Sequence, residues 1–188
     1  MSIGFWNDHN LEPKRGFRFI LVIPGSTPET HVQQYLIKTV KKPAFTLGES
    51  THQYLNHTFY FPGRVSWTES SFTIVDVVDS DSNGSKEIME ILEASGYVLP
   101  VDPNVLSTIS KKKAVDALGT VIIRTIDAEG SPVEEWHLHN AYVAGATFGD
   151  LSYESDDMLN IDVTLKYDYA WLEVLGQGGG KVPSNASG

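Results

Sequence analysis

The chain has 188 residues, of which 41% are hydrophobic and 20% are charged, a balance that suits one globular domain with a core of its own. Its formal net charge of −10 argues against a protein that grips nucleic acid through phosphate contacts. It contains no cysteine, which excludes disulfides and thiolate metal sites, and no apolar stretch approaches the roughly 18 residues of a membrane span. We also expect no secretory signal peptide, because no basic flank followed by an apolar run opens the chain.

The N-terminal third predicts two strands and a long apolar excursion. Residues 1–16 are polar and irregular and predict an N-terminal arm. Apolar runs at 17–23 and 35–40 predict strands, separated by a loop at 24–34. Residues 43–62 are too apolar for a free loop and too irregular for a clean strand. We therefore predict an extended segment that buries its aromatic side chains against another part of the assembly, such as a second subunit.

Residues 64–78 predict a strand whose phase slips once. Val65 and Trp67 share one parity, whereas Phe72 and Ile74 share the other. Because side chains alternate between the two faces of a strand, one extra residue between these pairs would reconcile them. We therefore predict a β-bulge at that point.

One helix is predicted, at residues 85–95. Ile88, Ile91 and Leu92 follow the i, i+3, i+4 spacing of a helix face. Gly96 stands where a residue in the left-handed conformation would end the helix.

The following segment predicts a loop and then a pair of strands. Residues 97–113 contain two prolines and end in three lysines, which predicts a loop with a solvated basic end. Residues 118–126 predict a strand, 127–130 a turn, and 136–143 the returning partner strand.

The clearest pattern lies at residues 158–171, where apolar and polar residues alternate almost without fault. Only a strand separates side chains with period two, so this segment predicts one long, half-exposed strand. At about 3.3 Å per residue it would span roughly 40 Å, about twice the common strand length. Such a strand suggests a large sheet, and one shared between subunits.

This order of strands, one helix and further strands predicts a mainly β fold, namely an antiparallel two-sheet sandwich or barrel with one flanking α-helix. We place the domain at residues 17–175, after the N-terminal arm at 1–16. The tail at 176–188 is rich in glycine and small polar residues, which predicts a flexible end.

A calcium loop is one candidate site. Asp79, Asp81, Asn83, Gly84 and Glu90 satisfy the pattern of a twelve-residue loop that wraps a hard cation in oxygen ligands. A strand, however, precedes this segment where such loops follow a helix. The alternative is a strand-to-helix turn whose polar side chains cap the helix, and we favour it.

A histidine pair is a second candidate site. His137 and His139 lie on one face of a predicted strand, as a metal pair would. In a metal-binding cupin barrel a glutamate follows within about five residues, but no carboxylate follows here, so we favour a packed or surface pair. We predict no catalytic, cofactor-binding or metal-binding residues, and no enzyme.

The C-terminal half resembles the tail tube proteins of contractile bacteriophages. The likeness rests on Glu-Trp-His-Leu-His-Asn-Ala-Tyr at 135–142, Phe-Gly-Asp-Leu-Ser-Tyr at 148–153 and the strand at 157–169. That family closes on a strand of the form I-x-V-T-L-x-Y-D-Y, usually followed by Trp; here Ala170 stands before Trp171. With the strand, turn and helix before them, these motifs extend the resemblance over about 64–171.

The resemblance implies a two-sheet β barrel flanked by one helix, whose copies form hexameric rings that stack into a hollow tube inside a sheath. Inner strands of neighbouring subunits would join into one continuous barrel, which leaves no open sheet edge. A long loop that reaches the next ring is typical, and 43–62 is the candidate segment. An acidic lumen is also usual, and it fits the net charge of −10.

The resemblance further implies the role and the partners. The chain would be a structural subunit of the inner tail tube, with the tail sheath protein, the baseplate and tail terminator proteins, and a tape measure protein in the lumen as partners. DNA would pass without sequence-specific binding, and no membrane would be involved. The protein would be assembled in the host cytoplasm and reside in the virion.

Four alternatives stay open. The runners-up are a tube-like ring of the baseplate or terminator and the tube of a contractile injection machine related to type VI secretion. From other classes, a calcium-binding β-sandwich module and a β-barrel enzyme remain.

Overall fold

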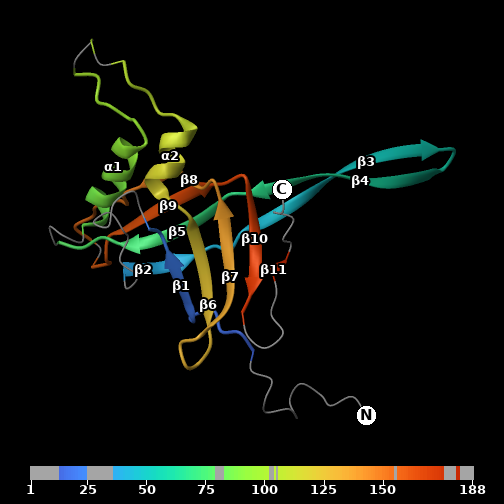
Figure 1. The fold of residues 1–188 in the computed structure, drawn as a ribbon, viewed down its shortest axis with the longest axis horizontal. Helices are drawn as coiled ribbons and strands as arrows, with labels where there is room; N and C mark the ends of the chain where they lie inside the picture. The colour runs from blue at the N-terminus through green and yellow to red at the C-terminus, as the bar shows by residue number, and fades with distance from the viewer. Residues whose placement is uncertain are drawn as a thin grey trace.

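The fold is a sandwich of two antiparallel sheets with a long hairpin that projects from one end and two short helices at the other (Figure 1). The strands of the two sheets cross at a steep angle, as in orthogonal sheet packing. The computed structural model describes residues 13–24, 36–78, 83–101, 104, 106–154, 156–175 and 181–182.

Sheet A has the strand order β1-β6-β7-β10-β11. Its members are β1 (Phe19–Val22), β6 (Val121–Ile126), β7 (Pro132–His139), β10 (Tyr169–Val174) and β11 (Lys181–Val182). Sheet B has the order β2-β5-β9-β8. Its members are β2 (Ile37–Val40), β5 (Ser70–Val75), β9 (Asn160–Lys166) and β8 (Tyr142–Thr147).

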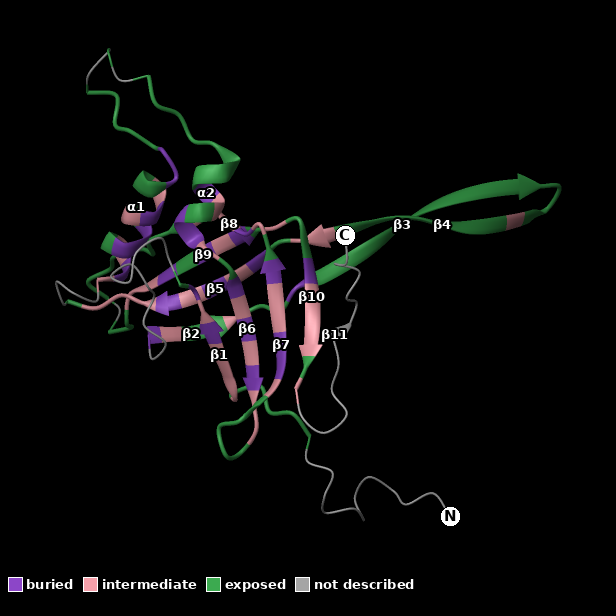
Figure 2. Cartoon of the chain, viewed as in Figure 1, coloured by how far each residue is buried: buried purple, intermediate pink, exposed green. Residues whose placement is uncertain are grey.

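The core lies between the two sheets, and buried residues alternate with less buried ones along β5, β6 and β9 (Figure 2). In β6 and β9 every second residue is buried, because a half-exposed strand turns one face to the core. The buried cluster consists of Leu21, Ile23, Phe72, Ile74, Ile88, Ile91, Ala117, Leu118, Val121, Ile123, Leu138, Ala141, Ile161, Val163 and Leu165.

The strand predicted over 158–171 is wrong as a single element. β9 ends at Lys166 in sheet B, and β10 begins at Tyr169 in sheet A, so the chain changes sheets at Tyr167 and Asp168. The alternation does not indicate this change of sheet, because a strand that bends around a core continues to present apolar residues to it.

Asp168 stabilises this corner. Its backbone N–H donates to the carbonyl of His139 at 3.0 Å. Its carboxylate accepts hydrogen bonds from Lys111 Nζ at 2.7 and 2.8 Å and from Asn140 Nδ2 at 2.7 Å. The bonds from Lys111 and from Asn140 hold the pKa of Asp168 below its usual value, so the group stays ionised at neutral pH.

The strand predicted at 136–143 crosses the same corner and is likewise divided. It starts earlier, within β7, leaves sheet A after His139, and continues in sheet B as β8. Asn140 makes the change with a positive φ of 53°. β8 ends at Thr147, beyond the predicted strand end at residue 143.

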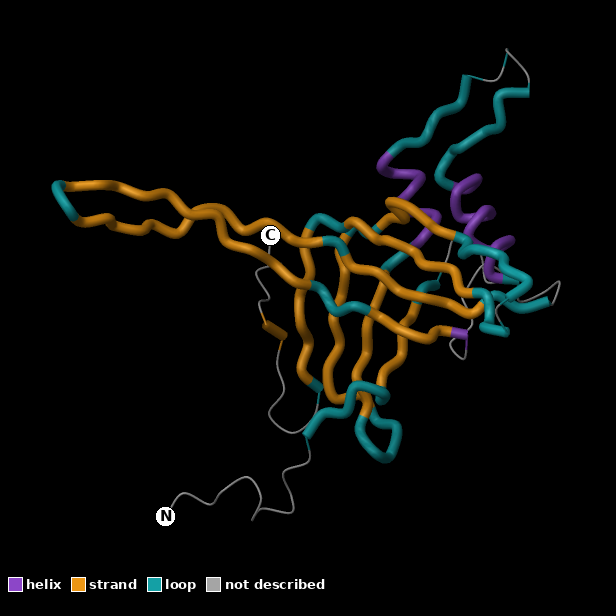
Figure 3. The backbone as a smooth tube through the Cα atoms, turned by 180° about the vertical axis from the view of Figure 1, so that it is seen from behind, coloured by secondary structure: helices purple, strands orange, loops and turns teal. Residues whose placement is uncertain are grey.

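The segment predicted as an irregular excursion at 43–62 forms part of a regular hairpin. Its strands are β3 (Ala44–Tyr54) and β4 (His57–Thr68), paired antiparallel in a sheet of their own. β2 leads into β3 and β4 returns into β5, so the hairpin prolongs the β2–β5 pair beyond the sandwich (Figure 3). The single strand predicted at 64–78 is wrong as one element: β4 ends at Thr68 and β5 begins at Ser70 in sheet B. The predicted change of phase is therefore a break between two strands at Glu69, where the chain leaves the hairpin, and not a β-bulge.

The helix predicted at 85–95 is confirmed as α1 (Gly84–Ala94), and Gly96 follows it with φ of +101°. A second helix, α2 (Lys111–Leu118), lies where the sequence predicted a loop ending in lysines. Ser110 caps it, since its side chain accepts from the Lys113 backbone N–H, and Leu118 enters the core. The two helices close one end of the sandwich, and none of the described helices is of the length and apolarity needed to cross a membrane.

Several sequence predictions concern residues outside the described ones. These are most of the N-terminal arm at 1–16, nearly all of the loop at 24–34, and the carboxylates Asp79 and Asp81. The tail predicted as flexible at 176–188 is described only at Lys181 and Val182, which pair with β10.

Candidate assembly surfaces

The β3–β4 hairpin presents one aromatic face to solvent. Alternation places Phe59, Phe61 and His57 on that face, with Tyr54 beside them across the ladder. Tyr54 is 64% exposed, Phe59 46% and Phe61 52%. Tyr60 lies on the opposite face and is 69% exposed. A soluble monomer rarely exposes so many large apolar side chains together, so this surface is a candidate for contact with another protein chain.

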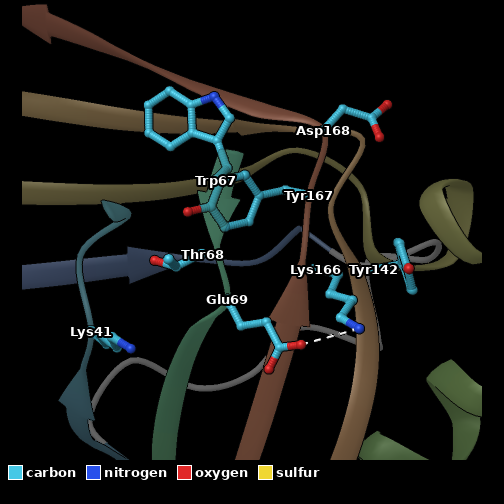
Figure 4. A pocket seen from close by; sticks show the side chains of 8 residues that line it. All are labelled: Lys41, Trp67, Thr68, Glu69, Tyr142, Lys166, Tyr167 and Asp168. Carbon is cyan, nitrogen blue, oxygen red and sulfur yellow. Dashed lines mark ion pairs between the residues drawn. The ribbon is translucent and has the colours of Figure 1, made fainter. Parts of the chain in front are cut away.

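The base of the hairpin is anchored by aromatic contacts, and a hollow of about 600 Å³ opens beside it (Figure 4). Trp67 of β4 lies 5.5 Å from the ring of Phe45 and 6.0 Å from that of Tyr167, measured between ring centroids. Lys166 Nζ pairs with Glu69 Oε1 at 3.1 Å across the hollow. Both charged side chains are half exposed and form an ordinary surface ion pair. We therefore interpret the residues around the hollow as positioning the hairpin and not as a catalytic site.

Two further connections expose apolar side chains. The α1–α2 connection contributes Leu99, Val101 and Leu106, and the β8–β9 connection contributes Leu151 and Tyr153. Together with the hairpin they give the sandwich three apolar extensions, a pattern typical of a subunit that is completed by its neighbours.

The outer face of sheet B is polar. In register, Thr39, Thr73, Asp162 and Thr147 form a row that crosses all four strands. Thr39 Oγ1 donates to Thr73 Oγ1 at 3.0 Å, and Thr73 Oγ1 donates to Asp162 Oδ1 at 2.6 Å. This face therefore suits contact with water or a passing solute rather than burial in a core.

A basic hollow of about 430 Å³ lies between β1 and β2, at the open side of the sandwich. Its cationic lining consists of Lys14, Arg15, Arg18, Lys38 and Lys42. In a chain with a net charge of −10, this concentration of cations fits an acidic surface of a neighbouring copy.

Glu134 is the buried partner of two of these lysines. It is 5% exposed and accepts from Lys14, Lys42 and Thr125. Burial by itself raises the pKa of this carboxyl, but the hydrogen bonds from Lys14 and Lys42 and their charges outweigh it, and the pKa lies below its usual value. Glu134 thus ties the N-terminal segment and the start of the hairpin to sheet A.

We expect neutralisation of Glu134 to lower the free energy of unfolding more at neutral pH than at acidic pH. Because its folded-state pKa is lowered, Glu134 stabilises the protein above its unfolded value of 4.5, and this contribution disappears as the pH falls through the folded-state pKa. Glu134→Gln should cost about 1 to 3 kcal/mol at pH 7. Urea denaturation of both proteins from pH 7 to pH 3 measures this; a gap that stays constant with pH would contradict it.

The calcium pattern is only partly described, and its described residues serve the helix. Asn83 Oδ1 accepts from the Lys86 backbone N–H at 2.8 Å, which makes Asn83 the N-cap of α1. Glu90 lies 3.8 Å from Lys86 Nζ as an i, i+4 pair. Both observations fit the capping interpretation that the sequence favoured.

The two histidines share a face of β7, as predicted, and each stacks on an aromatic ring of β10. His137 lies on Trp171 at 3.8 Å between centroids with an interplanar angle of 2°, and His139 lies on Tyr169 at 4.6 Å. His137 is partly buried and His139 is exposed. Glu135, two residues before His137 on the same face of β7, and Glu173, brought by pairing with β10, both lie close to His137.

Solved structures of contractile injection particles share this fold. The chain aligns with one in the baseplate of the anti-feeding prophage at a TM-score of 0.62 and 16% identity, covering 89% of this chain and 99% of that one. It aligns with the tube-terminating cap of that prophage at a TM-score of 0.63 and 14% identity, covering 93% of this chain and 100% of that one. It aligns with the sheath/tube terminator of the PVC extracellular contractile injection system at a TM-score of 0.61 and 15% identity, covering 86% of this chain and 97% of that one.

No protein-family model matches the sequence, and a search of curated proteins also gives no match. The evidence for the shared fold is thus carried by the backbone, since the alignments cover 86% to 93% of this chain at 14% to 16% identity. They agree with the sequence motifs of 64–171 that resemble tail tube proteins. This chain therefore has the tail-tube-like fold found in contractile injection systems.

Proposed function

We propose that this chain is a structural tube subunit, whose copies form hexameric rings that stack into a hollow conduit. The aromatic face of the β3–β4 hairpin carries this proposal. It extends beyond the sandwich, where no described residue outside the hairpin covers it, and a stacked neighbour would bury it (Figure 2).

Ring closure would join the edges of sheet B. β2 and β8 are the edge strands of this sheet in the described part of the chain, and each leaves one row of backbone groups unpaired within its sheet. Pairing of β8 of one copy with β2 of the next would continue the sheet around the ring and remove both edges. The basic hollow beside β2 would then meet an acidic surface of the neighbour.

In this arrangement the polar row of sheet B would face the channel. Asp162 stands at the centre of the row, among threonines. Lys166 shares this face with Asp162 but pairs with Glu69. A lumen in which hydroxyl and carboxylate groups predominate would hold phosphates weakly, so DNA would slide through it. The acidic lumen expected from the net charge of −10 is part of the proposal.

For a contractile phage, the tube would lie inside the tail sheath, with baseplate and terminator proteins at its ends and a tape measure protein in its lumen. Contraction of the sheath would drive the tube outward, and DNA would leave through it. The subunit would act by rigidity and charge, without catalysis. The basis of this assignment is the likeness of residues 64–171 to tail tube proteins.

A second candidate is a single ring at the baseplate or at the tube end, or the tube of a contractile injection machine. It is favoured by the alignments with a baseplate chain and with a terminating cap. Length of polymer separates a single ring from either kind of tube, because a terminator or baseplate ring ends after one layer.

Negative-stain electron microscopy of the purified chain at low and high concentration tests the proposal. We expect six-fold rings at low concentration and hollow rods at high concentration. Rings that never stack would favour the terminator or baseplate role. Small monodisperse particles, even after addition of a preformed baseplate or tube end as a nucleus, would contradict both.

A further inference from the structure

Three side chains with metal-ligand chemistry meet on the outer face of sheet A. Trp136 and Leu138 of β7 pack on the core, so the alternate residues Glu135 and His137 lie on the other face. Glu173 of β10 pairs in register with Glu135 and joins them there. One ligand atom of each lies within 4.8 Å of those of the other two.

The distances suit a small cation. His137 Nε2 lies 3.4 Å from Glu135 Oε2 and 3.7 Å from Glu173 Oε2. Ligand atoms held at about 2.0 to 2.2 Å by a tetrahedral zinc ion lie roughly 3.3 to 3.6 Å apart. The three groups are therefore already close to the separation of first-row metal ligands.

The cluster is also largely shielded and held in place. The side chains of Glu135 and His137 are 12% and 13% exposed. Parallel stacking on Trp171 fixes the plane of the His137 ring. Arg124 Nε donates to Glu135 Oε1 at 2.5 Å, which orients that carboxylate and leaves its other oxygen toward His137.

Two carboxylates directly opposite each other on neighbouring strands repel, and partial burial strengthens the repulsion. Such a pair calls for a compensating positive charge between its members. Arg124 pairs with Oε1 of Glu135, on the side of that carboxylate away from His137. Glu173 lies on the neighbouring strand, β10. A divalent cation among the three groups would compensate both carboxylates and join β10 to β7.

We propose that Glu135, His137 and Glu173 form a binding site for a first-row divalent metal ion, with zinc as the best fit. The imidazole ligand favours zinc or a similar transition metal over calcium and magnesium, which prefer oxygen alone. Three protein ligands leave a coordination position for water or for a side chain of a neighbouring copy. The site serves as a clamp between two strands and is independent of the proposed tube function.

Isothermal titration of the tag-free, chelator-treated chain with zinc chloride tests the site, using His137→Gln and Glu173→Gln as variants. We expect one zinc ion per chain, a higher unfolding temperature with zinc, and at least about a hundred-fold weaker binding in either variant. His139→Gln is the matched control, because His139 lies on the same face of β7 and also stacks on an aromatic ring of β10. It should bind zinc within about three-fold of the unaltered chain.

Circular dichroism and the visible spectrum of added Co²⁺ complete the experiment. If His137→Gln loses its fold, Glu173→Gln decides, since it removes a charge at a partly exposed position and preserves the shape of the side chain. Absence of stoichiometric zinc binding in the unaltered chain would overturn the proposal. So would binding that survives Glu173→Gln in a folded chain, or that is lost equally in His139→Gln.

Discussion

Replacing Phe59 and Phe61 together by serine is expected to abolish stacking of rings while the chain remains folded. Both side chains lie on the aromatic face of the β3–β4 hairpin and are about half exposed, so they contribute little to the core. Buried at an interface, an aromatic anchor of this kind contributes about 2 kcal/mol or more. Loss of one such contribution raises the concentration needed for assembly by about thirty-fold, and the double substitution should do at least that.

Sedimentation and electron microscopy over a range of concentrations measure this effect, and urea denaturation reports the stability of the fold. Tyr60→Ser is the matched control, because Tyr60 lies on the opposite face of the same strand and is also exposed. The assignment of the aromatic face would fail if both variants assembled alike. Unfolding free energies should differ from the unaltered chain by no more than about 0.5 kcal/mol.

Gly96→Ala is expected to have the largest effect on stability of any small substitution considered. Gly96 ends α1 with φ of +101°, a conformation that L-residues with a side chain rarely adopt. A Cβ placed there would lie 2.7 Å from the backbone carbonyl oxygen of Thr108, which belongs to the segment leading into α2. Strain and displacement of that segment together should cost about 2 to 4 kcal/mol.

Gly130→Ala separates the two causes. Gly130 has φ of +84° in the β6–β7 turn, but nothing lies within 4 Å of the position of its Cβ. It should therefore show only the backbone strain, about 1 kcal/mol. Chemical denaturation of both variants compares their losses in unfolding free energy. Equal losses would contradict the prediction, because they would mean that the segment around Thr108 moves away from the new Cβ at no cost in free energy.

Local patterns in the sequence were sufficient for the strands and the helix that obey one period from end to end. β1, α1 and its terminating Gly96 were predicted because propensity, spacing and a glycine signal agree within a few residues. The two-sheet class also followed, since alternating strands must bury one face. The ordered motifs of 64–171 pointed to the tail-tube-like fold that the solved structures share.

Other elements depended on contacts that the sequence does not display. α2 has only eight residues, begins with three lysines, and is stabilised by packing of Ala117 and Leu118 in the core rather than by its own propensity. The hairpin at 44–68 has apolar residues on positions that no core covers, so its pattern looked irregular although its strands are regular.

The bends and the candidate metal cluster were decided by the tertiary structure alone. A period of two continues through a bent strand, so residues 158–171 looked like one element, whereas bonds from Lys111 and Asn140 to Asp168 turn the chain between sheets. The same turn aligns β10 with β7, which sets Glu173 opposite Glu135. Sequence determines which faces are apolar, because that is a local property; which faces meet depends on register and on where the chain turns, and both are set by contacts distant in sequence.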